Sequence, residues 1–173
     1  MTEARCERRT RLEHTNLCLI AMAYTEVEAR VQLLDKLADA TDQLGEALTS
    51  LGAAYEQLDE QQADRLEDQL FRPVQRAYGR AKRTHAQFAS RYRLGDREFT
   101  MKSAKLPSTG VLGFIEDAIG AVERADFELV ALQESSLAIE VGDVNLRAGV
   151  AEVRQLIDGV SAVARSFVRS FGR

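Results

Sequence analysis

Apolar side chains recur in an unbroken alternation of three and four residues over the last third of the chain. This spacing places them on one stripe of an α-helix, and the phase survives Gly142. From Ile115 to Phe171 a single helix would be about 85 Å long, so it needs partners of similar length in a bundle or coiled coil. The stripe is apolar except at Ser136 and Asp143: Ile115, Ala118, Val122, Ala125, Leu129, Leu132, Ser136, Ile139, Asp143, Leu146, Val150, Val153, Ile157, Val160, Ala164, Phe167 and Phe171.

Two earlier stretches have the same periodicity and predict two further helices. Thr41 or Asp42 is a candidate N-cap between them, because short polar side chains accept hydrogen bonds from the first amides of a helix. We therefore predict helices at about 8–40, 42–103 and 111–171, in one domain that spans 1–173. Their stripes are Ile20, Tyr24, Val27, Val31, Leu34 and Ala38, then Leu44, Leu48, Leu51, Tyr55, Leu58, Leu66, Leu70, Val74, Ala77, Ala81, Thr84, Phe88 and Tyr92.

The two prolines shape the predicted arrangement. Pro73 should kink the second helix, since proline removes a backbone hydrogen bond and clashes with the preceding turn. The segment 106–110, with Pro107 and Gly110, predicts a turn that sends the third helix back antiparallel to the second. The shorter first helix completes an elongated three-helix coiled coil, and the stripe left uncovered predicts a curved, crescent-shaped homodimer.

A second architecture stays open. If Gly142 and Asp143 end the last helix, the chain folds as a compact four-helix monomer, about half as long as the extended dimer. Both alternatives are all-α, in agreement with scarce aromatic residues, no Trp and two Pro.

The composition also bears on the cellular compartment in which we expect the protein. No stretch reaches the eighteen apolar residues of a membrane span. A short apolar run at 16–24 follows four arginines, but Glu3, Glu7 and Glu13 interrupt the basic stretch, so we do not expect a cleaved signal peptide. Cys6 and Cys18 are expected to be reduced thiols of a cytoplasmic protein.

Charge is unevenly distributed along the predicted second helix. Residues 42–68 hold eight acidic residues and one base, whereas residues 72–105 hold ten bases and two acids. Such a basic cluster could hold a dimer on anionic lipid, at about 1 kcal/mol per residue. The candidate lipid contacts are Arg72, Arg76, Arg80, Lys82, Arg83, Arg91, Arg93, Lys102 and Lys105.

The alternative for this cluster is pairing within the fold. An antiparallel third helix would bring six acidic residues back beside it and neutralise part of the charge. Nucleic acid is an unlikely partner, because the chain has no reader motif, no zinc pattern and a net charge of −4. The six residues are Glu116, Asp117, Glu123, Asp126, Glu128 and Glu134.

The central segment also resembles a known family. Residues 51–67, followed by Pro73, Tyr78-Gly79, Lys82-Arg83 and the Phe88-x-x-Arg91 motif, resemble the second helix of the BAR-domain superfamily, and within it the Chibby-interacting BAR-domain family. The resemblance implies an antiparallel crescent homodimer that binds anionic membranes and senses or shapes their curvature. It also implies a peripheral membrane location at the ciliary base and a small coiled-coil partner protein.

Catalysis has little support in the sequence. His14 and His85 lie in different predicted helices, and neither follows a glutamate at the spacing used in helical metal sites. We expect no enzyme activity, no catalytic or metal-binding residues and no cofactor. The alternative to membrane binding is a helical scaffold or adaptor that binds another coiled-coil protein without contacting lipid.

Overall fold

The computed structural model describes the backbone of residues 3–101 and 110–171, and the side chains of residues 25–101 and 110–170. The described part of the chain is all-α and contains no strand, as the sequence predicts. Its elements, in chain order, are α1 (Glu3–Tyr55), α2 (Glu60–Leu66), the π-helical turn η1 (Glu67–Phe71), α3 (Arg72–Tyr92), α4 (Val111–Glu134), α5 (Ser136–Glu140), α6 (Val144–Ile157) and α7 (Val160–Phe171).

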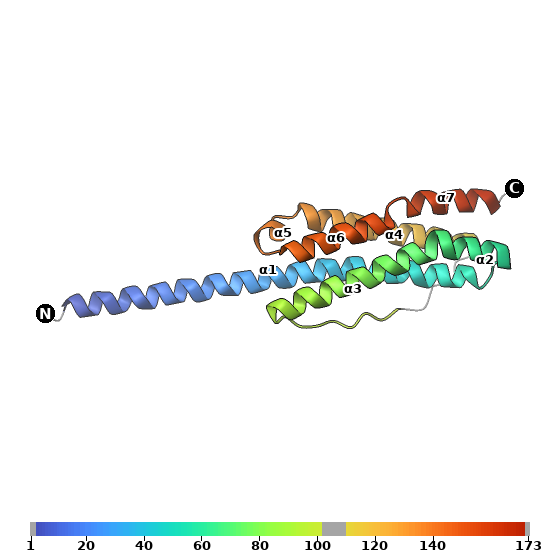
Figure 1. Cartoon of the computed structure of the whole chain (residues 1–173). Helices are drawn as coiled ribbons and strands as arrows, with labels where there is room; N and C mark the ends of the chain where they lie inside the picture. The colour runs from blue at the N-terminus through green and yellow to red at the C-terminus, as the bar shows by residue number, and fades with distance from the viewer. Residues whose placement is uncertain (1–2, 102–109, 172–173) are drawn as a thin grey trace.

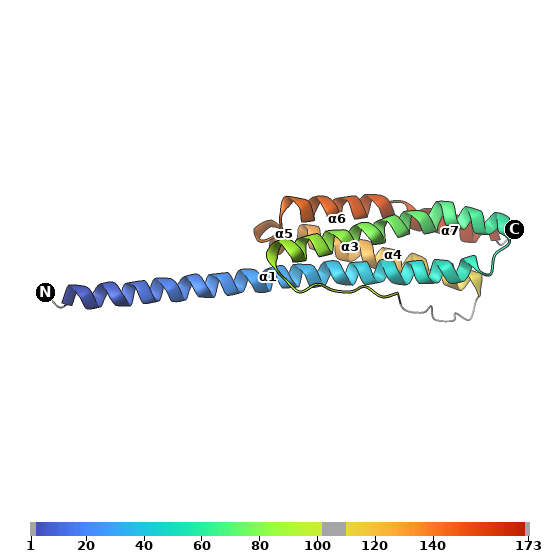
Figure 2. The same cartoon turned by 60° about the horizontal axis from the view of Figure 1, so that its bottom comes forward.

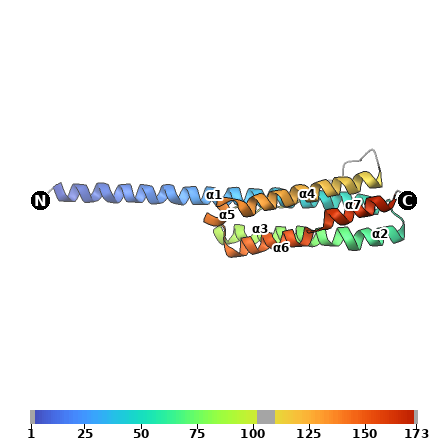
Figure 3. The same cartoon turned by 90° about the horizontal axis from the view of Figure 1, so that it is seen from above.

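Four helical layers surround one core (Figure 1). The second half of α1 packs against α4 and α3, α3 packs against α6, and α6 and α7 pack against α4. Neighbouring layers run antiparallel, and an extended segment returns along the outside of the bundle from the end of α3 toward the start of α4 (Figure 2). The first half of α1 continues alone beyond the other helices (Figure 3).

The apolar stripe of residues 115–171 correctly predicts the core. Every member whose side chain is described is buried except Ser136, Ile139 and Asp143. Ile139 is 73% exposed. These three exceptions lie together where the chain turns between α4 and α6. The stripe keeps its phase because α4 and α6 line two walls of the same core, so both present apolar residues at helical spacing.

The predicted single helix over 111–171 is therefore wrong, because the chain ends it with two N-caps. The Ser135 hydroxyl accepts a hydrogen bond from the Ala138 amide, and the Asp143 carboxylate accepts one from the Leu146 amide at 2.7 Å. Gly142 fits the turn between them, because a Cβ there would lie 2.4 Å from the Ala138 carbonyl oxygen. The alternative prediction that Gly142 and Asp143 end the last helix is correct for the backbone, since α5 ends at Glu140 and α6 begins at Val144.

The predicted boundary between the first two helices is also wrong. Thr41 is fully buried inside α1, and its hydroxyl donates to the Leu37 carbonyl oxygen at 2.7 Å rather than capping a new helix. The turn instead follows Tyr55, and Asp59 caps α2 by accepting a hydrogen bond from the Gln62 amide. Gln62 occupies the missing position of the stripe between Leu58 and Leu66.

The predicted helix over 42–103 ends early as well. α3 stops at Tyr92, because Arg93 adopts a left-handed conformation with φ 55°. The disruption expected at Pro73 takes the form of the π turn η1, which ends two residues before the proline. A wider turn there relieves the clash between the proline ring and the carbonyl four residues earlier.

A close contact between α3 and α6 requires a glycine at position 149. A Cβ at Gly149 would lie 2.3 Å from Thr84 Oγ1 and 3.0 Å from Thr84 Cβ. Both residues are buried, so at this point α3 and α6 can pack this closely only because residue 149 has no side chain.

Replacing Gly149 with Ala should lower the free energy of unfolding by about 1–3 kcal/mol, because overpacking forces α3 and α6 apart. Adding Thr84→Ala should recover part of the loss. The matched control is Gly52→Ala in α1, where a Cβ meets nothing within 4 Å. That change should stabilise the protein by about 0.5–1 kcal/mol. Urea unfolding measures all four proteins, and a Gly149→Ala variant as stable as wild type would contradict the close packing.

Candidate interaction surfaces

The predicted lipid contacts fall mainly on one helix. Six of the nine lie on α3, which has no acidic residue, and Arg93 follows at its C-cap. Lys102 and Lys105 lie outside the described residues. The six on α3 are Arg72, Arg76, Arg80, Lys82, Arg83 and Arg91.

Three of these residues are held in ion pairs. Arg80 forms an ion pair with Glu152 of α6 at 2.7 Å. Arg91 donates two hydrogen bonds to the Asp143 carboxylate, at 2.7 and 3.1 Å. Arg72, the first residue of α3, pairs with Glu67 and Asp68 of the preceding turn η1. Lys82 makes no such pair with any described residue, but its ammonium group lies 5.2 Å from the centre of the Tyr78 ring. Pairing within the fold thus accounts for part of the basic cluster.

The acidic partners are not the predicted ones, because α3 packs against α6 rather than against α4. Acidic residues of α4 pair elsewhere. Glu123 binds Arg165 of α7, and Asp126 accepts a hydrogen bond from Arg154 of α6 at 2.9 Å. The sequence does not reveal Glu152 and Asp143 as partners, since the pairing depends on which helices are neighbours.

A basic ridge remains on the outer side of α3, formed by Arg72, Arg76 and Arg83. These positions are separated by four and seven residues, so they share one face of the helix over about 17 Å. Arg76 and Arg83 are exposed and have no ion-pair partner within the described part of the chain, and the same is true of Arg93. Within the described part of the chain, the uncompensated positive charge of the ridge therefore comes from Arg76 and Arg83, since Arg72 is paired with Glu67 and Asp68.

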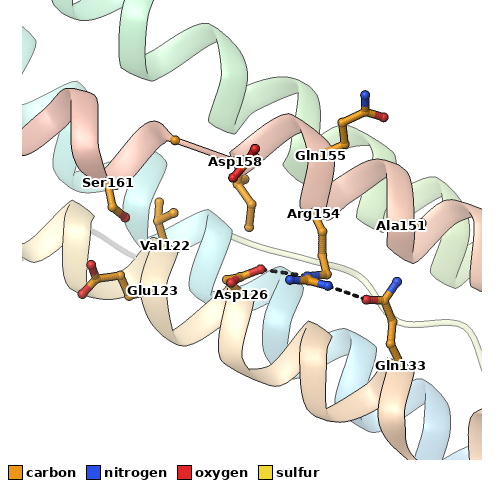
Figure 4. A pocket seen from close by; sticks show the side chains of 11 residues that line it. Val122, Glu123, Asp126, Gln133, Ala151, Arg154, Gln155, Asp158 and Ser161 are labelled. Carbon is orange, nitrogen blue, oxygen red and sulfur yellow. Dashed lines mark hydrogen bonds and ion pairs between the residues drawn. The ribbon is translucent and has the colours of Figure 1, made fainter.

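A polar groove lies between α4 and the junction of α6 with α7 (Figure 4). Arg154 of α6 reaches across it and donates to two residues of α4, the Asp126 carboxylate at 2.9 Å and the Gln133 amide oxygen at 2.7 Å. Asp158 and Ser161 lie at the rim. Because both donating nitrogens of the guanidinium group are bound to α4, the Arg154 side chain joins α6 to α4 across the groove.

The second surface is on α1, where the helix leaves the bundle. Val27 is 48% exposed and Val31 is 40% exposed, although Leu34 and Ala38 on the same stripe are buried. Arg30 marks the end of the bundle, because its guanidinium group lies 4.5 Å from the centre of the Tyr92 ring of α3. The apolar stripe thus passes from a covered to an uncovered part of one helix.

Among the described residues, no group of three or more His, Cys, Asp or Glu side chains could hold a metal ion. No helix in the described ranges is long and apolar enough to cross a membrane. Comparisons with protein-family models, with curated proteins and with solved structures find no match for this chain.

Replacing Asp143 tests the junction that turns the chain into α6. Asp143→Ala should lower the free energy of unfolding by roughly 1–2 kcal/mol, because it removes both the N-cap and the Arg91 ion pair. Asp143→Asn is the matched control, since asparagine caps as well as aspartate but carries no charge, and it should cost less than about 1 kcal/mol. If thermal unfolding shows the same small loss of stability for Asp143→Ala and Asp143→Asn, the N-cap contributes little to the stability of the fold.

Proposed function

We propose that this chain is a helical association module, in which the four-layer bundle supports α1 and the free part of α1 pairs with the same helix of a second copy. The observation that carries this proposal is the apolar stripe of α1, which is buried at Leu34 and Ala38 but exposed at Val27 and Val31. An apolar stripe that leaves its own bundle is typical of an interface with another chain.

The length of α1 supports the same conclusion. At 53 residues it is more than twice as long as α4, its main partner in the bundle. A single helix in water gains little from its own hydrogen bonds, and most helical stability in proteins comes from packing an apolar face. In the sequence the stripe continues through Tyr24 and Ile20. A two-fold pair would cover both copies of the stripe with one contact.

A single added charge should separate the two copies. Val31→Glu places a carboxylate on the stripe, and burying it without a partner is costly, so we expect at least a tenfold weaker dimer. Gln32→Glu adds the same charge one residue away, at an exposed position off the stripe, and should leave the dimer intact. Light scattering at several protein concentrations measures both variants.

Two results would count against a homodimer through α1. One is a wild-type chain that stays at the monomer mass of 19.2 kDa at every concentration. The other is a Gln32→Glu variant that dissociates as readily as Val31→Glu. A monomer that captures a helical partner would favour the adaptor alternative.

A second candidate function is binding of anionic membrane lipids through the basic ridge and Arg93. It is favoured by the exposed, unpaired guanidinium groups of Arg76, Arg83 and Arg93. The resemblance of residues 51–91 to the BAR-domain superfamily supports it. On this second proposal, the chain would form a crescent-shaped dimer that senses membrane curvature at the ciliary base. At about 1 kcal/mol each, three unpaired bases would contribute roughly 3 kcal/mol.

Co-sedimentation with vesicles tests the lipid proposal. The Arg76→Gln, Arg83→Gln double variant should bind vesicles containing anionic lipid at least tenfold more weakly, because it removes two unpaired charges from the ridge. The matched control removes two charges from α7, at Arg165 and Arg169, and should bind like wild type. Binding of the wild-type chain should also weaken as salt rises. Equal binding to neutral vesicles would contradict a charge-driven contact.

A further inference from the structure

An extended strap, residues 93–101, returns from the end of α3 along the surface of α1 and α3 (Figure 2). It begins at the left-handed Arg93, and the Leu94 amide closes the end of α3 by donating to the Ala89 carbonyl oxygen at 2.9 Å. On α1, Asp42 accepts a hydrogen bond from Arg97 at 2.6 Å. The strap has no helix or sheet of its own, and is held by this backbone hydrogen bond at its start and by side-chain contacts further along.

Phe99 is the apolar anchor of the strap. Its ring meets the edge of the His85 ring, with the two centres 5.1 Å apart and the planes at 89°. The Tyr78 hydroxyl donates to the Phe99 carbonyl oxygen at 3.4 Å. Burial, and next the charge of Asp42, raise the pKa of Tyr78, so the phenol stays protonated and able to donate. Both anchoring side chains belong to α3.

His85 is an unusual residue for such a position. It is only 3% exposed, and its Nδ1 has no hydrogen-bond partner among the described residues. A neutral imidazole leaves one nitrogen without a proton, but an imidazolium must donate from both. Protonation under the closed strap would therefore bury a charge with an unsatisfied donor, which is strongly unfavourable.

The charged groups around His85 come from two other elements. Asp35 of α1 and Asp96 of the strap favour the protonated ring, whereas Arg97 of the strap opposes it. Burial outweighs them and lowers the pKa of His85 below its ordinary value of 6.5. In the opened state the ring would be solvated and would titrate near that ordinary value.

We infer that the strap is an acid-released clamp, which stays closed while His85 is neutral and opens when the ring takes up a proton. Above about pH 7.5 both states hold a neutral ring and closure is independent of pH. Below it the open state binds the extra proton, so closure weakens as the pH falls. For one proton the open fraction rises by up to about tenfold per pH unit, until the closed form is protonated too. Opening frees Phe99 and uncovers the surface of α3 beneath it.

Hydrogen exchange followed by mass spectrometry tests the clamp directly. After correction for intrinsic exchange rates, amides of the strap should exchange up to about fivefold faster at pH 5.5 than at pH 6.5, but only about twofold faster at pH 6.5 than at pH 7.5. Aspartate side chains ordinarily titrate near pH 4, so this window isolates the imidazole. Unchanged strap exchange at pH 5.5 in the wild-type chain would overturn the inference.

Two variants separate His85 from the other attachments. His85→Asn cannot titrate, so its strap should exchange at the same corrected rate at every pH in the window. Arg97→Gln removes the contact with Asp42 and should raise exchange at all pH values while keeping the acid dependence. Acid dependence that persists in His85→Asn would assign the effect to carboxylates and contradict the clamp.

Titration of the wild-type ring gives a readout that needs no change at His85. The chain has two histidines, so its imidazole proton spectrum holds two sets of signals. His14→Asn removes one set and assigns the other. We expect His85 to titrate below pH 6.5, and a midpoint at or above that value would contradict a ring buried in its neutral form.

Discussion

Burial of the α1 stripe is the constraint on which the rest of the structure depends. From Leu33 to Ala54 this helix contributes one wall of the core, and α3 and α4 cover it from two sides. α6 then closes the core by packing against both of those helices, and α7 packs against α4 and η1. The bundle covers only the second half of α1, so the stripe emerges uncovered at Val27 and Val31. The same constraint thus builds the core and creates the proposed interface.

Much of this architecture could be predicted from the sequence. The apolar stripes identify the all-α class and most buried positions, because the period of a helix is written directly in the spacing of apolar residues. Helix ends are harder, since helices on different walls of one core can share a phase. The sequence marks these helix ends only by polar residues within the apolar stripes. Ser136 and Asp143 interrupt the last stripe, and Gln62 interrupts the second. Each interruption lies within a few residues of an N-cap.

The surfaces were less predictable than the core. The basic composition of α3 is plain from the sequence, but which arginines remain free depends on the neighbour that α3 meets. Arg80 and Arg91 find acidic partners on α6, and Arg76 and Arg83 do not. The strap shows the same limit, because residues 93–101 lie within the helix predicted over 42–103 and yet fold back over His85. Long-range packing decided these features.

The central claim is that two chains meet through the free part of α1. Its most direct test is pulsed electron spin resonance on a chain that carries one spin label at Gln32, with Cys6 and Cys18 replaced by Ser. If the α1 helices pair, labels on the two chains lie close enough to give a dipolar signal, and Val31→Glu abolishes it. A label at Gln32 that gives no intermolecular signal at concentrations where the chain is dimeric would contradict pairing through α1.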